Sequence, residues 1–206
     1  MHLPSFVPYA FRITASASNP FGIEGFYAGN FALSWYGIGL ALEGVRSGDY
    51  QRVALAAAVS RTIGRTKNIG ITFRTANETA GKLSKFSYDM DIGLGTQYRN
   101  ATFGITAYSI LGRYRQMLSF FSDLKINPVQ IGVELAQSRE RPMFIRGYIG
   151  YKINHSLSFK LVSSSDPRIW SFGAEFSGPL KINYVFRNYI EIGVTHVISV
   201  TMDISR

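Results

Sequence analysis

The chain has 206 residues, a formal net charge of +9, no cysteine, and many glycine, tyrosine and phenylalanine residues, with a mean hydropathy near zero. Its length suits one domain, and without cysteine it can form neither disulfides nor thiolate metal sites. The longest uncharged stretch, 26–42, is interrupted by Asn30 and Ser34, so it does not provide the ~20 apolar residues that a membrane-spanning helix needs. The composition therefore favours β structure.

The basic residues are scattered along the chain and fall mostly at predicted turns and strand ends. Nucleic-acid binding usually requires a clustered basic face, so we expect no nucleic-acid partner. Basic residues near strand ends are instead suited to the phosphates of membrane lipids and lipopolysaccharide.

Alternation of apolar and polar side chains with a period of two is typical of strands that have one apolar face. In the first part of the chain it predicts strands over 9–16, 31–44, 51–63, 67–77, 84–98 and 101–112. Residues 20–28 stay undecided, and any helix is a short loop element around 113–125. In the second part it predicts strands over 129–136, 142–153, 157–161, 170–176, 180–186 and 190–204.

Turn residues separate these runs, for example Ser47-Gly48-Asp49, Asp166-Pro167 and Gly178-Pro179, and such residues favour hairpins. Neighbouring strands should therefore be antiparallel. We predict one domain over 1–206 with about twelve strands, within a range of about ten to fourteen.

The less apolar faces of the predicted strands carry charges, which include Asp89, Asp91, Glu134, Arg146 and Glu175. In a transmembrane barrel such faces line the lumen, while the apolar faces meet lipid. The runs 84–98 and 190–204 are longer than ordinary globular strands, and aromatic residues lie near strand ends, as an interfacial girdle requires. We therefore predict an all-β, antiparallel transmembrane β-barrel in a bacterial outer membrane; the alternative is a soluble β-sandwich or β-barrel binding protein.

The amino terminus lacks the basic segment and apolar core of a secretory signal. Three explanations stay open: the signal has been removed, the sequence is a fragment, or the chain is not exported.

Several segments resemble the FadL-like outer-membrane proteins of the PorV/PorQ type. The likeness lies in the run Ser87–Arg99, in Ser177–Tyr184 with its Gly-Pro-Leu, in Ile192–Val200 with its Gly-x-Thr-His, and in Asn19-Pro20-Phe21-Gly22-Ile23, which is similar to an amino-terminal hatch. It covers roughly residues 19–204, although Phe21 and Val197 depart from the family pattern. The resemblance implies that 17–28 forms a hatch-like segment, with Asn19 and Pro20 as hatch residues.

The same resemblance implies two roles. One is a non-enzymatic component of a secretion or cell-envelope assembly that binds a protein partner, and the other is a conduit for hydrophobic small molecules. We favour the first role, because passage of hydrophobic molecules needs an apolar lumen and the inner faces are charged.

The three histidines, His2, His155 and His196, are not spaced as metal ligands, and no HExxH motif occurs. His155-Ser156 and Thr195-His196 lack an evident acidic partner for nucleophilic chemistry. We therefore expect no catalytic residue, no metal and no cofactor. A lipid-modifying enzyme at the outer leaflet is the remaining alternative.

Overall fold

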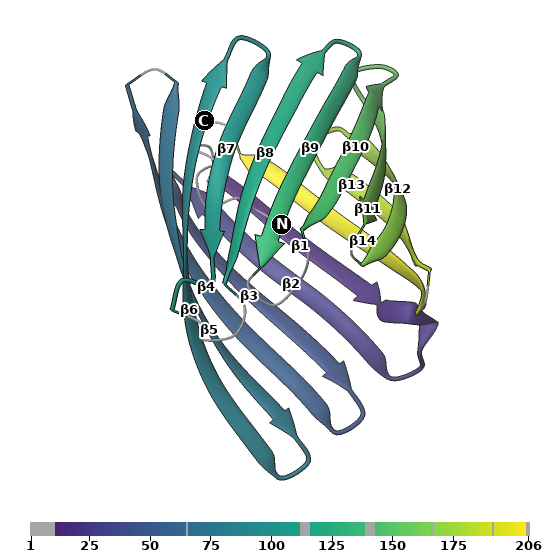
Figure 1. The fold of residues 1–206 in the computed structure, drawn as a ribbon. Coiled ribbons are helices and arrows are strands. Elements are labelled where there is room, and N and C mark those ends of the chain that lie inside the picture. The colour runs from purple at the N-terminus through teal and green to yellow at the C-terminus, as the bar shows by residue number, and fades with distance from the viewer. Residues whose placement is uncertain are drawn as a thin grey trace.

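The computed structural model describes residues 11–64, 66–111, 116–138, 143–165, 167–190 and 192–204. Its strands form one closed antiparallel barrel in which each strand pairs with its neighbours along the chain (Figure 1). The first strand, β1, pairs with the last, β14, and this pairing closes the sheet. The expected all-β antiparallel barrel is confirmed.

The fourteen strands are β1 (Phe11–Asn19), β2 (Phe26–Trp35), β3 (Ile38–Ser47), β4 (Tyr50–Ile63), β5 (Lys67–Ala80), β6 (Leu83–Tyr98), β7 (Ala101–Tyr108), β8 (Met117–Ile126), β9 (Val129–Ser138), β10 (Phe144–Lys152), β11 (Leu157–Ser165), β12 (Arg168–Ser177), β13 (Lys181–Tyr189) and β14 (Gly193–Ile204). One 3-10 helix, η2 (Pro20–Gly22), lies between β1 and β2. Within the described ranges, no helix is long and apolar enough to cross a membrane.

The prediction of a single strand over 31–44 is wrong, because the chain turns at Tyr36 and Gly37 between β2 and β3. The φ angles of these two residues are 46° and 79°, and positive φ at both central residues is what a tight two-residue hairpin needs. A tyrosine at the first of these positions gave no turn signal.

The expectation of a loop helix around 113–125 is also wrong where the structure describes it, since Met117–Ile126 forms strand β8. Apolar neighbours such as Phe120 and Phe121 occupy opposite faces here, so alternation was hard to see. These two corrections raise the number of strands from about twelve to fourteen. The first residues of the predicted strands 9–16 and 142–153 lie outside the described residues.

Exposure alternates along the wall and separates its two faces. In β4, Val53, Leu55, Ala57 and Val59 are exposed, whereas the residues between them are partly covered. Residues paired across neighbouring strands share a face, so the registers extend this assignment around the whole barrel.

The outer face carries a continuous apolar belt. Its members include Leu40, Leu42, Leu55, Val59, Ile71, Phe73, Leu94, Phe103, Phe120, Ile131, Val133, Leu135, Ile145, Ile149, Leu161, Phe172, Ile182 and Ile198, all of them exposed. Soluble proteins rarely expose an apolar patch of this size to water. A barrel that faces lipid requires such an apolar belt.

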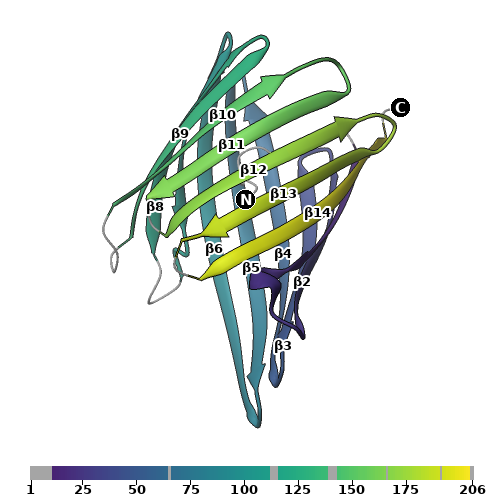
Figure 2. The ribbon, with the colours of Figure 1, turned by 90° about the vertical axis from the view of Figure 1, so that its right-hand side faces the viewer.

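The two ends of the barrel differ. One end, here called the turn end, has two-residue connections at 36–37, 99–100 and 127–128. The opposite end, here called the loop end, also has two-residue connections, at 48–49, 81–82 and 166–167. It holds the longest connections as well, 20–25 between β1 and β2 and 109–116 between β7 and β8, whereas no connection at the turn end exceeds four residues. The hairpins β3–β4 and β5–β6 reach beyond the other strands at the loop end (Figure 2).

Candidate functional site

The lumen is the candidate site, because the strand registers bring polar side chains from all parts of the chain onto one closed inner face. On β1–β4 this face is built mainly from small side chains. They are Thr14, Ser16 and Ser18 on β1, Ala28, Asn30 and Ala32 on β2, Gly39 and Ala41 on β3, and Ala54, Ala56 and Ala58 on β4. Small side chains project little, so this wall leaves space inside the barrel.

Two aromatic rings on the inner face lie against the wall. Gly104 pairs with Phe121, and Gly132 pairs with Tyr148. A Cβ at either glycine would collide with the ring of its partner, so each ring covers a glycine of the neighbouring strand. The Nζ atom of Lys160 lies 3.5 Å from the centroid of the Tyr148 ring.

An ion-pair cluster spans the strands that close the barrel. The Asp203 carboxylate on β14 accepts hydrogen bonds from the Arg12 guanidinium on β1, with Nε at 2.5 Å, and from Lys181 on β13. Thr14 and Thr201 also pair across this seam, with their hydroxyl oxygens 3.1 Å apart. The cluster lies near the turn end and connects the first strand to the last two.

A second cluster lies near the loop end. Arg52 on β4 binds Glu43 on β3 at 2.5 Å and Glu78 on β5 at 3.3 Å. On the neighbouring strands, Arg74 donates to Asp91 at 2.5 Å. Asp91, which is 4% exposed, also accepts the backbone N–H of Ser109 at 2.9 Å, so it ties the β7–β8 connection to β6.

A third group lies halfway along the barrel. Glu134 on β9 accepts a hydrogen bond from the Ser119 hydroxyl at 2.7 Å and from the Arg146 guanidinium at 3.2 Å. Arg146 and Glu134 are direct cross-strand partners. Opposite charges in this arrangement stabilise the sheet while both groups face the lumen.

The connection η2 folds inward at the loop end. The backbone N–H of Phe21 donates to the Thr195 hydroxyl at 3.0 Å, and the Phe21 ring meets the Tyr189 ring edge-on at 5.2 Å. Thr195 and Tyr189 both belong to the inner face. The η2 segment therefore narrows the mouth of the lumen beside β13 and β14.

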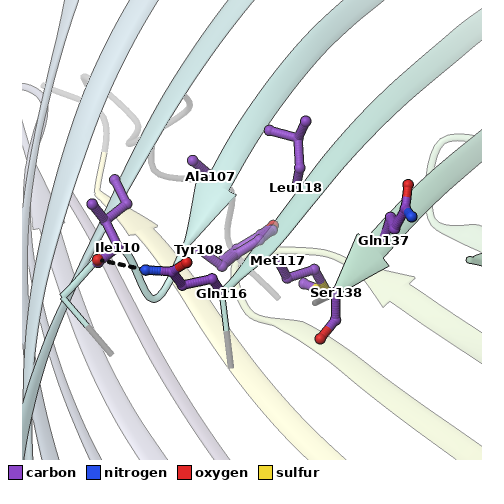
Figure 3. Close-up of a pocket in the computed structure, with 8 residues that line it drawn as sticks. All are labelled: Ala107, Tyr108, Ile110, Gln116, Met117, Leu118, Gln137 and Ser138. Atoms are coloured by element: carbon purple, nitrogen blue, oxygen red, sulfur yellow. Dashed lines mark hydrogen bonds between the residues drawn. The ribbon is translucent and has the colours of Figure 1, made fainter. Parts of the chain in front are cut away.

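A cavity of about 450 Å³ opens at the loop end, where β7 stops and β8 begins (Figure 3). Its lining comes from the β7–β8 connection and from the ends of three strands: Ala107, Tyr108, Ile110, Gln116, Met117, Leu118, Gln137 and Ser138. Inner-face and outer-face residues both contribute, so the cavity lies in the rim of the wall and not at the centre of the lumen.

The predicted lumen residues Asp89, Asp91, Glu134, Arg146 and Glu175 all lie on the inner face. The predicted hatch residues lie elsewhere: Asn19 ends β1 and Pro20 begins η2. The segment 17–28, for which a hatch was predicted, consists of the end of β1, the η2 connection and the start of β2.

Sequence reasoning missed several charged inner-face residues. Arg12, Arg52 and Arg187 join the lumen through their registers with neighbouring strands. The alternation of apolar and polar residues within β1 and β4 could have placed Arg12 and Arg52 on the inner face, but neither residue was assigned to a face from the sequence.

Two of the three histidines lie in the described part of the chain. His196 is on the outer face, and its Nδ1 atom lies 2.6 Å from the Tyr184 hydroxyl. His155 lies in the connection between β10 and β11, and His2 is outside the described residues. The described residues contain no group of three potential metal ligands.

Solved structures with the same architecture cover nearly the whole chain. Outer membrane protein Omp33 of Acinetobacter baumannii matches with a TM-score of 0.65 at 7% identity, over 96% of this chain and 99% of that one. The toluene transporter TodX of P. putida matches with a TM-score of 0.65 at 10% identity, over 98% and 92%. The KdgM porin matches with a TM-score of 0.52 at 11% identity, over 94% and 99%.

The chain has the fold of bacterial outer-membrane β-barrels. This agrees with the location that the sequence predicted. No protein-family model matches the sequence, and no curated protein matches it either. At these identities the likeness concerns the fold, and TodX, of the FadL family, is one of several barrels that share it.

Proposed function

We propose that this protein is a non-enzymatic channel that lets small polar solutes cross the bacterial outer membrane. The observation that carries this proposal is the composition of the inner face, which consists of small, hydroxyl and charged side chains. Along each strand these residues alternate with the apolar residues of the outer belt. An inner face of that kind suits a water-filled lumen.

The outer surface supports insertion in the outer membrane. Arg46 on β3 and Arg168 on β12 are exposed, face outward and lie near the loop end. Basic side chains at this level would meet the phosphates of lipopolysaccharide. Short connections usually face the periplasm and longer ones the outside, so we place the loop end outside.

Passage of hydrophobic molecules, the role implied by the FadL-like resemblance, is less well supported. Charged groups such as Arg74, Asp91, Glu134 and Arg146 lie on the inner wall along its length. An apolar solute moving along this wall would take the place of water around those charges, which is costly.

The direct test is conductance in a planar lipid bilayer of the purified, detergent-folded chain. We expect stable single-channel currents. Ala56→Trp, which places a bulky side chain on the inner face of β4, should lower the single-channel conductance, whereas Ala57→Trp on the outer face of the same strand should leave it unchanged. A folded protein that carries no current would contradict the channel.

A second role is favoured by the hairpins that project at the loop end. Strand β6 pairs with β5 along Leu83–Thr96 but with β7 only from Ile92 onward. Leu83, Phe86 and Tyr88 are 77%, 67% and 67% exposed on this projection. Within the described residues, no strand pairs with the free edge of β6 before Ile92, where β7 begins to pair with it. A free strand edge is suited to pairing with an extended segment of another protein.

This projection supports the secretion or cell-envelope role, in which the barrel binds a protein partner, and the PorV/PorQ-like segments support it as well. Isolation from the native envelope in detergent should then yield a stoichiometric partner with the wild-type chain, and none with the double variant Phe86→Ser and Tyr88→Ser. Recovery of the wild-type barrel without a partner would argue against this role.

A further inference from the structure

Apart from Arg12 on β1, the charged residues of the inner face are divided between two walls. The wall formed by β3–β9 contains six carboxylates, namely Glu43, Glu78, Asp89, Asp91, Asp123 and Glu134, and four basic residues, Arg52, Arg74, Lys85 and Lys125. The wall formed by β10–β14 has five basic residues, Arg146, Lys152, Lys160, Lys181 and Arg187, and two carboxylates, Glu175 and Asp203. These walls are called the acidic wall and the basic wall below.

Most carboxylates of the acidic wall are already engaged. Glu43 and Glu78 share Arg52, and Asp91 binds Arg74. Glu134 binds Arg146 of the basic wall. Asp123 accepts a hydrogen bond from the Gln130 amide at 2.7 Å. Four of the six carboxylates therefore bind an arginine, whereas Asp89 accepts the backbone N–H of Met90 at 2.7 Å and Asp123 accepts a neutral amide. The negative charge that this wall offers to a passing cation is thus reduced by its own ion pairs.

The basic wall keeps cations that lack such partners. Within the described residues, no carboxylate lies within 4.0 Å of the charged nitrogen atoms of Lys152, Lys160 or Arg187. All three residues are exposed. On this wall Asp203 binds Arg12 and Lys181, and Glu175 accepts a hydrogen bond from the Ser177 hydroxyl at 3.1 Å. Lys160 is attracted by Asp123 and Glu175 over more than the length of a salt bridge.

The three cations follow the length of the lumen. Arg187 lies two residues before the loop end of β13, Lys160 lies within β11, and Lys152 ends β10 at the turn end. Successive sites along one wall let an ion pass from one to the next. A lumen bounded by a low-dielectric wall also concentrates the field of such charges and enriches ions of the opposite sign.

We propose that the basic wall makes this channel prefer anions, with Arg187, Lys160 and Lys152 as the residues that set the preference. The solute class it fits is small carboxylates, phosphates and other anions. This inference rests on the proposed channel function, which it makes specific.

The experiment is the reversal potential across a planar bilayer with a ten-fold KCl gradient, measured at low ionic strength because salt screens charges over ~10 Å at 0.1 M. For the wild type we expect chloride to permeate more readily than potassium, on the order of ten-fold. The triple variant Arg187→Gln, Lys160→Gln and Lys152→Gln should bring this ratio to about one or below.

A matched control removes basic charge from the outer face. Arg61→Gln and Lys67→Gln change exposed residues of β4 and β5 whose side chains face away from the lumen, so they should leave the reversal potential unchanged. Folding of every variant is checked by its heat-dependent migration in gels.

The outcomes separate the two proposals. A conducting wild type that prefers potassium, or a triple variant with the wild-type chloride preference, would overturn the anion preference and leave the channel standing. An equal shift in the outer-face control would also overturn it. A folded wild type that carries no current would overturn the channel and, with it, the preference.

Discussion

The two residues that turn the chain between β2 and β3 show how strongly single positions constrain this barrel. Gly37 has a φ of 79°, and its carbonyl oxygen accepts the backbone N–H of Ser60 at 2.7 Å. A Cβ at this position would collide with the carbonyl oxygen of Ser60. The turn therefore needs glycine both for its backbone conformation and for the close approach of β4.

Gly37→Ala should lower the free energy of unfolding by at least about 1–2 kcal/mol, because a non-glycine residue in the left-handed region is strained. The measurement is urea unfolding of the protein folded in lipid vesicles. Gly44→Ala serves as the control, since no atom lies within 4 Å of a Cβ built there, and its effect should stay within about 0.5 kcal/mol. An equal decrease in the free energy of unfolding of the two variants would show that the backbone conformation and close packing at Gly37 do not contribute to stability.

Individual strands could be predicted wherever alternation was unbroken. The run over 84–98 corresponds to β6 at Leu83–Tyr98, and the run over 51–63 corresponds to β4 at Tyr50–Ile63. Prediction failed at β8, where apolar residues occupy both faces, and at the β2–β3 turn, where Tyr36 takes a positive φ that its side chain does not favour. In both cases tertiary pairing, and not local preference, determines the structure.

The opposite faces of one strand should respond differently to charge. Ala57 and Ala58 are neighbours on β4, and Ala57 is the more exposed of the two because it faces outward. Ala57→Arg places a charge against lipid and should lower the free energy of unfolding in vesicles by about 2–4 kcal/mol. Ala58→Arg places its side chain in the polar lumen, so it should lower the free energy of unfolding by less than about 1 kcal/mol. A larger loss for Ala58→Arg would reverse the assignment of the faces.

For the whole molecule, the barrel class followed from the sequence, but the arrangement inside the lumen did not. Asp89, Glu134, Arg146 and Glu175 could be assigned to the less apolar faces from alternation alone. The pairing of Arg12 with Asp203 joins the two ends of the chain, and the division into an acidic and a basic wall depends on all the registers together. These features exist only once the barrel has closed.

The central claim is that the inner face of this barrel meets water while its outer face meets lipid. The chain contains no cysteine, so single cysteines introduced at neighbouring positions can report on each face without further changes. Ala56 faces inward and Ala57 outward on the same strand, β4, which makes them a matched pair.

The most direct measurement is labelling of Ala56→Cys and Ala57→Cys with a charged, water-soluble thiol reagent after each variant has been folded into lipid vesicles. The structure predicts that Ala56→Cys reacts and that Ala57→Cys does not, although a lipid-soluble maleimide should label the latter. Protection of Ala56→Cys, or reaction of both positions with the charged reagent, would contradict a water-filled barrel surrounded by lipid.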